Sequence, residues 1–329
     1  MVAKGERSPQ ALLMNQMFPS IVAVLFAAFT LSIQPSAQAD TFGSETNTFD
    51  ISFVNIGDAG NAADTTGYGA VDYSYRIATH EVSVDMIAKA NAAGSLGVTF
   101  DVRTADKPAT AISWNEAARF VNWLNLSSGY TAAYNFSLQP GDVGYSANAD
   151  ISLWQTGDVG YSAANPYRNA NAHYFIPSEN EWYKSAYFIA GALAYFDYPT
   201  GSDSAPISVV GGTATGTAVY NQPSGQGPAA VTNAGGLSPY GTMAQGGNAS
   251  EWMETAFSGT NSDASNARTL RGGAWPNDTT LMASARNSAG PANESDNVGF
   301  RVASVPEPST YALLLMAGAG ALWWARRRL

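Results

Sequence analysis

The sequence predicts a domain of short strands and a few helices, joined by long irregular loops, with a hydrophobic segment at each end of the chain. Three observations predict this architecture. Short alternating apolar runs are separated by stretches rich in Gly, Asn, Ser and Thr, and two capping boxes each begin a helical pattern. Three clusters of glycine and aromatic residues also lie close together between Gly246 and Arg301, which indicates tight turns packed on large side chains.

The composition limits the kinds of chemistry and partner. Hydrophobic residues make up 45% of the 329 residues, charged residues only 13%, and the formal net charge is −10. Nucleic acid is therefore an unsuitable partner, because phosphate binding needs a basic face. The chain has no cysteine, which excludes disulfides, thiolate catalysis and cysteine metal sites. Cations or neutral glycans fit such a surface better.

The N-terminal segment has the order of a secretory signal peptide. Lys4 and Arg7 precede an apolar run from Ile21 to Ile33, and Ala37-Gln38-Ala39 provides a small-residue cleavage site. The alternative is an N-terminal membrane anchor, but the run is shorter than the roughly 20 residues that a spanning helix needs. We therefore expect residues 1–39 to be removed, so that the exported domain begins at residue 40.

The C-terminal segment, residues 305–329, has three parts in order. The motif Pro306-Glu307-Pro308 is followed by an apolar run from Tyr311 to Ala325, and Arg326, Arg327 and Arg328 come next. An apolar helix followed by arginines would sit in the membrane with the arginines on the cytoplasmic side. These parts closely resemble the PEP-CTERM sorting signal. The resemblance implies an exosortase-type processing enzyme as partner, an inner-membrane anchor during sorting, and a final location at the cell surface or outside the cell. The alternative is a plain tail anchor.

Local patterns predict several elements between the two ends. Alternation of Phe49, Ile51 and Phe53 predicts a strand, and residues 73–84 form a second strand-like run. Two capping boxes, at Ser113 to Glu116 and at Ser178 to Glu181, each predict a helix whose apolar face lies on the core. Residues 200–241 are expected to form long loops.

A short internal repeat lies between the two predicted helices. Residues 141–147 and 157–163 share the sequence Gly-Asp-Val-Gly-Tyr-Ser-Ala. Each copy has one carboxylate, whereas calcium takes six to eight oxygen ligands. A duplicated surface hairpin is the preferred interpretation, and calcium loops are the alternative.

Several segments, taken in order, resemble the sulfatase-modifying-factor family, which contains the formylglycine-generating enzymes. The resemblance covers residues 73–304 and implies an α+β, variant C-type-lectin-like fold with much irregular loop structure for a domain of residues 40–304. The matching segments are Pro108–Asn125, Phe175–Trp182, Tyr198–Pro199, Val219–Asn221, Gly247–Trp252, Arg271–Trp275, Ser284–Asn287 and Gly299–Arg301.

The family's known chemistry needs residues that this chain lacks. Formylglycine-generating enzymes use a pair of cysteines that binds copper, and the related sulfoxide synthases hold iron with three histidines. This chain has no cysteine, and its two histidines are His80 and His173. Neither copper nor iron is therefore expected, and we assign no catalytic residue.

Calcium is the one metal that the resemblance implies. In the family, a glycine, a small residue and a glutamate of the Gly-Asn-x-x-Glu-Trp motif bind calcium, and they correspond to Gly247, Ala249 and Glu251. Asn221 corresponds to the asparagine of a second family calcium site. The family usually has Asp or Asn at the position of Ala244, so one ligand of the first site is replaced here.

The remaining signature residues are expected to hold the fold. They are Trp252, Arg271, Gly272, Gly273, Trp275, Arg286, Gly299, Phe300 and Arg301. The sequence thus predicts an exported, non-catalytic binding or structural module of the extracellular polysaccharide layer, with a glycan or protein as partner. The alternative is a formylglycine-generating or nonheme-iron enzyme with altered ligands.

Overall fold

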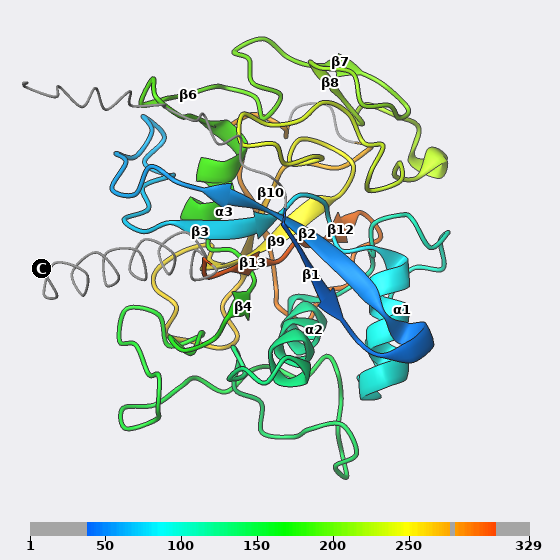
Figure 1. Ribbon diagram of the computed structural model, residues 1–329, viewed down its shortest axis with the longest axis vertical. Coiled ribbons are helices and arrows are strands. Elements are labelled where there is room, and N and C mark those ends of the chain that lie inside the picture. The colour runs from blue at the N-terminus through cyan, green and yellow to red at the C-terminus, as the bar shows by residue number, and fades with distance from the viewer. Residues whose placement is uncertain (1–37, 277–279, 307–329) are drawn as a thin grey trace, which may run out of the picture. The chain divides into compact units, whose positions relative to one another are not determined.

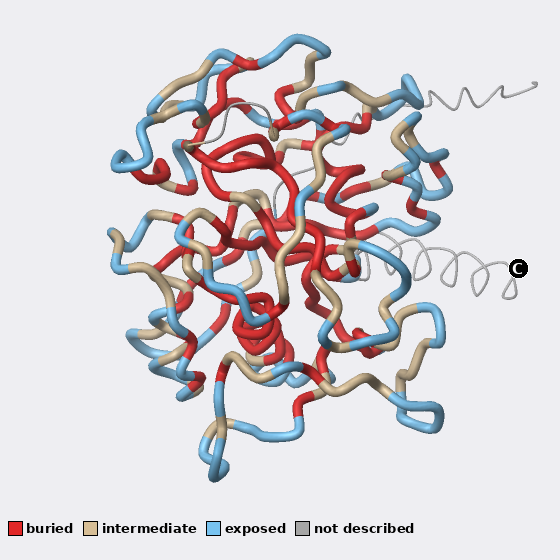
Figure 2. Tube along the Cα trace, turned by 180° about the vertical axis from the view of Figure 1, so that it is seen from behind, coloured by how far each residue is buried: buried red, intermediate tan, exposed pale blue. Residues whose placement is uncertain are grey.

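The computed structural model describes residues 38–276 and 280–306, which all fall within one compact unit. In this part of the chain, two larger sheets and three α-helices are joined by long loops (Figure 1). The mixture of short strands, few helices and irregular segments agrees with the expected α+β class. Figure 2 shows that buried segments converge at the centre, while exposed residues are concentrated in the outer loops.

The first sheet has five strands in the order β1-β2-β3-β13-β4, and every neighbouring pair is antiparallel. Its strands are β1 (Gln38–Phe42), β2 (Phe49–Ile56), β3 (Tyr75–Ala78), β13 (Ala303–Ser304) and β4 (Tyr174–Phe175). The predicted alternation in β2 is confirmed, because Phe49, Ile51 and Phe53 are all buried. The strand expected over residues 73–84 is wrong in extent, since β3 ends at Ala78.

The second sheet has four strands in the order β11-β10-β9-β12, and only β12 is parallel to its neighbour β9. Its strands are β11 (Asn287–Ala289), β10 (Arg268–Arg271), β9 (Ser250–Ala256) and β12 (Val298–Gly299). Two small sheets pair β5 (Phe188–Ile189) with β6 (Ala194–Tyr195), and β7 (Ile207–Ser208) with β8 (Thr217–Ala218). Short 3-10 turns lie at η1 (Glu45–Asn47) and η2 (Ser224–Gln226).

Both predicted capping boxes are confirmed. Helix α2 (Trp114–Ser127) begins after Ser113, whose hydroxyl accepts from the amide of Glu116 at 3.1 Å. Helix α3 (Glu179–Tyr187) begins after Ser178, and the carboxylate of Glu181 accepts from the Ser178 amide at 2.6 Å. These reciprocal bonds satisfy amides that have no partner within the helix.

A third helix, α1 (Val84–Gly94), was not predicted from the sequence. Its cap, Ser83, accepts from the amide of Met86 at 3.3 Å, but no Glu or Gln follows to complete a capping box. The β-branched residues Val82 and Val84 favoured a strand in the sequence pattern. Tertiary packing favours a helix instead, because the helical spacing of Ile87 and Ala90 places both side chains in the core, where they are fully buried.

Tryptophan side chains fasten α2 to the second sheet. Trp114 donates from its indole nitrogen to the carbonyl of Met253 at 3.0 Å, and Trp252 donates to the carbonyl of Ile112 at 2.9 Å. Both rings are completely buried, so these bonds satisfy groups that cannot reach water. The core cluster around them joins β1, β2, α1, α2 and β9.

The internal repeat forms two turns of the same design rather than the expected hairpins. Asp142 accepts from the amide of Gln139 at 2.7 Å, and Asp158 accepts from the amide of Gln155 at the same distance. Neither copy contains a strand. In each copy, one carboxylate oxygen of the aspartate thus stabilises the turn in which that residue lies.

Several predictions concern residues outside the described part. These are the apolar run and most of the signal peptide, Glu307 and Pro308, the apolar C-terminal run, and Arg326 to Arg328. Gln38 and Ala39 are described, so the predicted cleavage boundary lies within β1. Among residues 38–276 and 280–306, no helix is long and apolar enough to cross a membrane.

Candidate functional site

The glycine clusters pack two turns against neighbouring backbone. Gly247 has φ 91°, and a Cβ there would lie 2.3 Å from the carbonyl oxygen of Val219. Gly272 also has φ 91°, and its added Cβ would lie 2.8 Å from the carbonyl oxygen of Gln245. The amide of Gly247 donates to the carbonyl of Gly272 at 2.8 Å. Only glycine combines this conformation with such close approach.

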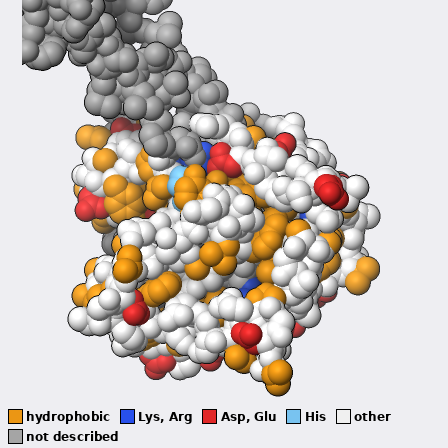
Figure 3. All heavy atoms as spheres, turned by 60° about the horizontal axis from the view of Figure 1, so that its bottom comes forward, with side chains coloured by type: hydrophobic (Ala, Val, Ile, Leu, Met, Phe, Trp, Pro, Cys, Tyr) orange, Lys and Arg blue, Asp and Glu red, His pale blue; other side chains and the backbone are white. Residues whose placement is uncertain are grey.

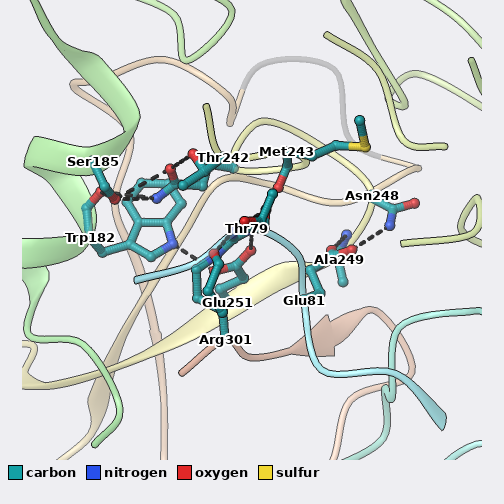
Figure 4. Close-up of polar contacts among 12 residues, drawn as sticks. Thr79, Glu81, Trp182, Ser185, Thr242, Met243, Asn248, Ala249, Glu251 and Arg301 are labelled. Carbon is teal, nitrogen blue, oxygen red and sulfur yellow. Dashed lines mark hydrogen bonds and ion pairs between the residues drawn. The ribbon is translucent and has the colours of Figure 1, made fainter. Parts of the chain in front are cut away.

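A completely buried ion pair lies beside these turns (Figure 4). Arg301 donates from Nη2 to Glu251 Oε1 at 2.5 Å and from Nε to Oε2 at 2.6 Å, and both side chains are inaccessible to solvent. Trp182 adds a third donor to Oε2 at 2.6 Å. The other bonds of Arg301 go to the carbonyls of Ala78, Thr79 and Met243. We call Glu251 and Arg301 the sealed pair.

A second buried carboxylate, Glu81, lies next to the sealed pair. It accepts from Asn248 Nδ2 at 2.6 Å and from the amide of Ala249 at 2.9 Å (Figure 4). Burial, reinforced by the charge of Glu251 and opposed by Arg301, raises the pKa of Glu81 to about 8. Burial and the Arg301 charge lower the pKa of the neighbouring His80 to about 4, which keeps this imidazole neutral at pH 7.

The geometry around Glu251 does not fit the calcium site that the family resemblance implies. Both Glu251 oxygens are bonded to Arg301, so a cation there would have to displace an arginine from a dry interior. Asn221 is exposed at φ 51°, and Ala244 provides no ligand oxygen from its side chain. Within residues 38–276 and 280–306, no three His, Cys, Asp or Glu residues are grouped to hold a metal. Calcium at this turn stays a prediction.

The arginines of the other signature motifs meet at Glu179, the first residue of α3. Arg271 donates from Nε to Glu179 Oε1 at 2.8 Å, and Arg286 donates to the two carboxylate oxygens at 2.6 and 2.7 Å. Arg286 lies over the rings of Tyr68 and Phe257, and its side chain is 22% exposed. We call Glu179, Arg271 and Arg286 the open triad.

A pocket of about 280 Å³ opens along β10, β11 and the segment leading to β12. We call it the β11 pocket. Its lining residues are Ser250, Leu270, Arg271, Gly272, Gly273, Thr280, Ala285, Arg286, Asn287, Ser288, Ala289, Asn293, Ser295, Asn297 and Val298. Hydroxyl and amide side chains therefore dominate the lining, beside the two arginines of the open triad.

Six polar side chains of the β11 pocket have no hydrogen-bond partner elsewhere in the described part of the chain. They are Ser250, Thr280, Ser288, Asn293, Ser295 and Asn297. The described residues that line the pocket include no carboxylate, histidine or lysine, and the two arginines are paired with Glu179. These described residues can recognise a ligand by hydrogen bonding, and none of them is a general base.

Sequence reasoning did not predict this set of six. Ser250 lies within the matched segment Gly247–Trp252, and the other five lie outside the matched segments. The signal that could have found them is the density of Asn and Ser between residues 287 and 297, immediately before the last signature cluster.

The predicted signature residues are placed in the interior. Trp252, Arg271, Trp275, Phe300 and Arg301 are each at most 2% exposed. Gly299 in β12 would bring a Cβ to 2.9 Å from the carbonyl oxygen of Ala109, and Gly273 would bring one to 2.3 Å from Thr280 Oγ1. Any larger residue at Gly273 or Gly299 would collide with these neighbouring atoms, so both glycines are needed for close packing.

Solved structures share this fold. The structure titled Treponema denticola variable protein 1 is similar with a TM-score of 0.56 and 19% identity, covering 83% of this chain and 100% of that one. The structure titled Crystal Structure of CarF gives 0.56 and 19% over 78% of this chain and 99% of that one. No curated protein sequence matches the chain. The chain therefore has the same fold as these two proteins.

The sequence then gives the family. Residues 26–305 match the family described as Sulfatase-modifying factor enzyme 1-like domain, and the chain belongs to that family. Residues 304–328 match the PEP-CTERM protein-sorting motif. The chain is therefore an exported protein that passes through a membrane-anchored sorting intermediate and is processed by an exosortase.

Proposed function

We propose that this protein is a non-catalytic binding module of the extracellular polysaccharide layer, and that the β11 pocket is its binding site. The observation that supports this proposal is the set of six neutral polar side chains without partners in the described chain. Polar groups that face a pocket and make no internal bond can exchange water for the hydroxyls of a ligand.

Charge favours an uncharged ligand. The chain has a formal net charge of −10, which repels acidic polymers at long range. The face shown in Figure 3 is largely neutral, with scattered acidic side chains and few basic ones in view. A neutral glycan meets no such repulsion and offers many hydroxyls to Ser, Thr and Asn side chains.

The alternative is an enzyme of the formylglycine-generating or nonheme-iron class with altered ligands. Two observations argue against it: the chain has no cysteine, and the described residues that line the β11 pocket include no carboxylate or histidine. Metal analysis and oxygen consumption of the purified domain separate the two functions. Stoichiometric copper or iron together with oxygen consumption would establish the enzyme and exclude the binding module.

The binding site is tested with a double variant, Ser250→Ala with Asn297→Ala. Because each good hydrogen bond is worth about 0.5–1.5 kcal/mol, we expect affinity for neutral polysaccharide to fall about tenfold. Affinity electrophoresis in gels containing neutral or acidic polysaccharides measures this change. The matched control, Ser128→Ala with Asn171→Ala, alters exposed residues outside the pocket. Unchanged retardation of the pocket variant would refute the assignment.

A further inference from the structure

A second pocket, of about 270 Å³, lies between β4, residues 162–172 and the end of β13. We call it the β4 pocket. Its lining residues are Tyr73, Ser162, Asn165, Arg168, Asn169, Ala170, Ala172, Phe175 and Val305. It shares no lining residue with the β11 pocket, and none of the sequence motifs pointed to it.

Arg168 is the one cation among the described residues that line the β4 pocket, and its Nη1 has no hydrogen-bond partner. The guanidinium lies 3.8 Å over the ring of Phe175, and the side chain is 16% exposed. Its nearest carboxylate contacts are ion pairs of 3.5 Å to Glu254 and 3.8 Å to Glu181. The guanidinium makes no hydrogen bond to any residue of the described chain, and its Nη1 is buried. Buried donors of this kind call for an acceptor, from water or from a ligand.

The two carboxylates behind Arg168 are already held in place. Tyr73 donates to Glu181 at 2.7 Å, whereas Tyr134 and Asn165 donate to Glu254 at 2.9 and 2.6 Å. Burial raises the pKa of Glu254, although the charge of Arg168 opposes this shift. Glu181 and Glu254 thus already compensate the positive charge of Arg168. An anionic ligand would bring a further negative charge close to these two carboxylates.

The rest of the pocket wall combines apolar and amide or hydroxyl side chains. Tyr73 is 44% exposed, and the other apolar members are Phe175, Ala170, Ala172 and Val305, beside the polar residues Ser162, Asn165 and Asn169. A ligand that fits must therefore present an apolar face to an aromatic ring and oxygen acceptors to a guanidinium. A pyranose ring has both, since its C–H groups form flat patches between its hydroxyls.

We propose that the β4 pocket binds one neutral sugar residue, with Arg168 donating to its ring or hydroxyl oxygens and Tyr73 covering a C–H face. A uronic acid of the same size is rejected because its carboxylate would approach Glu181 and Glu254. The site is separate from the β11 pocket, so the two can be tested independently. With both occupied, one domain would hold a neutral glycan at two points.

Ligand-observed NMR tests this proposal with D-glucose, D-galactose and D-glucuronate as probes and the folded domain as receptor. We expect saturation transfer to at least one neutral hexose and a several-fold weaker signal for glucuronate. Arg168→Met removes the donors but leaves Glu181 and Glu254 uncompensated, and this variant can fail to fold. Ala170→Trp therefore provides the second test, because Ala170 is exposed and lines the pocket.

The tryptophan at position 170 is expected to fill the pocket and abolish the hexose signal. Ala164→Trp, at an exposed alanine outside the lining, is the matched control and should bind as the parent does. The Ser250 and Asn297 double variant should also retain this signal, which separates the two sites. Absence of hexose binding, equal binding of glucuronate, or full binding by the Ala170→Trp variant would each overturn the proposal.

Discussion

The sealed pair and the open triad use the same chemistry, an arginine on a glutamate, in two different surroundings. In the sealed pair, Glu251 and Arg301 are both completely buried and every Glu251 oxygen has a donor. In the open triad, two arginines share Glu179, and Arg286 stays 22% exposed at the wall of the β11 pocket. Loss of Arg301 would leave Glu251 without an arginine partner, whereas loss of Arg286 would leave Glu179 still paired with Arg271. In both places the charged side chains fasten loops to the core.

Breaking the sealed pair should have the largest effect. Arg301→Met leaves Glu251 buried with only Trp182 as a donor, which should cost about 3–5 kcal/mol of unfolding free energy. Urea denaturation measures this loss. Lys89→Met is the matched control, because Lys89 pairs with Asp85 on the exposed face of α1 and should cost less than about 1 kcal/mol. Similar losses for the two variants would remove the distinction between buried and exposed pairs.

The open triad should tolerate the loss of one arginine. In Arg286→Met, Arg271 still donates to Glu179 at 2.8 Å, so we expect a loss of about 1–2 kcal/mol. The same urea titration gives the value. A loss of stability as large as that of Arg301→Met would show that Arg271 alone does not compensate the buried charge of Glu179.

Glu81 makes the surroundings of the sealed pair sensitive to pH. Its folded pKa of about 8 lies above the model value of 4.5, so its contribution to stability is complete below pH 4.5 and is lost as the pH rises through 8. Glu81→Gln should remove this slope, which the pKa shift puts at about 4 kcal/mol between pH 5 and pH 9. Urea midpoints at pH 5, 7 and 9 test it. Parallel pH profiles for parent and variant would show that Glu81 does not titrate in this range.

Calcium should have the smallest effect. Because Arg301 occupies both Glu251 oxygens, millimolar calcium should shift the melting temperature by less than about 1 °C. Differential scanning calorimetry with calcium and with a chelator provides the measurement. A saturable increase that the Glu251→Gln variant lacks would instead establish the family calcium site, with Arg301 displaced.

Local rules predicted the local features of this fold. The capping boxes at Ser113 and Ser178 were readable because all their partners lie within three residues. Helix α1 was missed because Val82 and Val84 resemble a strand and its cap has no second half. The family resemblance placed the signature residues in the interior but could not assign their partners.

Contacts between distant segments account for the rest. Glu251 and Arg301 are 50 residues apart, and only the pairing of β9 with β12 brings them together. The set of Ser250, Asn293 and Asn297 around the β11 pocket depends on the same pairing. Arg168 belongs to no motif. Its contacts with Phe175, Glu181 and Glu254 depend on the tertiary structure, so the sequence could not indicate its place in a pocket.

The position of the last strands also orders events during folding. β13 lies between β3 and β4, and β12 closes the edge of β9, so both larger sheets are incomplete until residues 298–304 have arrived. The pairing of β13 with β3 joins segments that lie far apart in the sequence. The sorting motif follows directly after these strands. The residues that complete both larger sheets are therefore the immediate neighbours of the sorting signal in the chain.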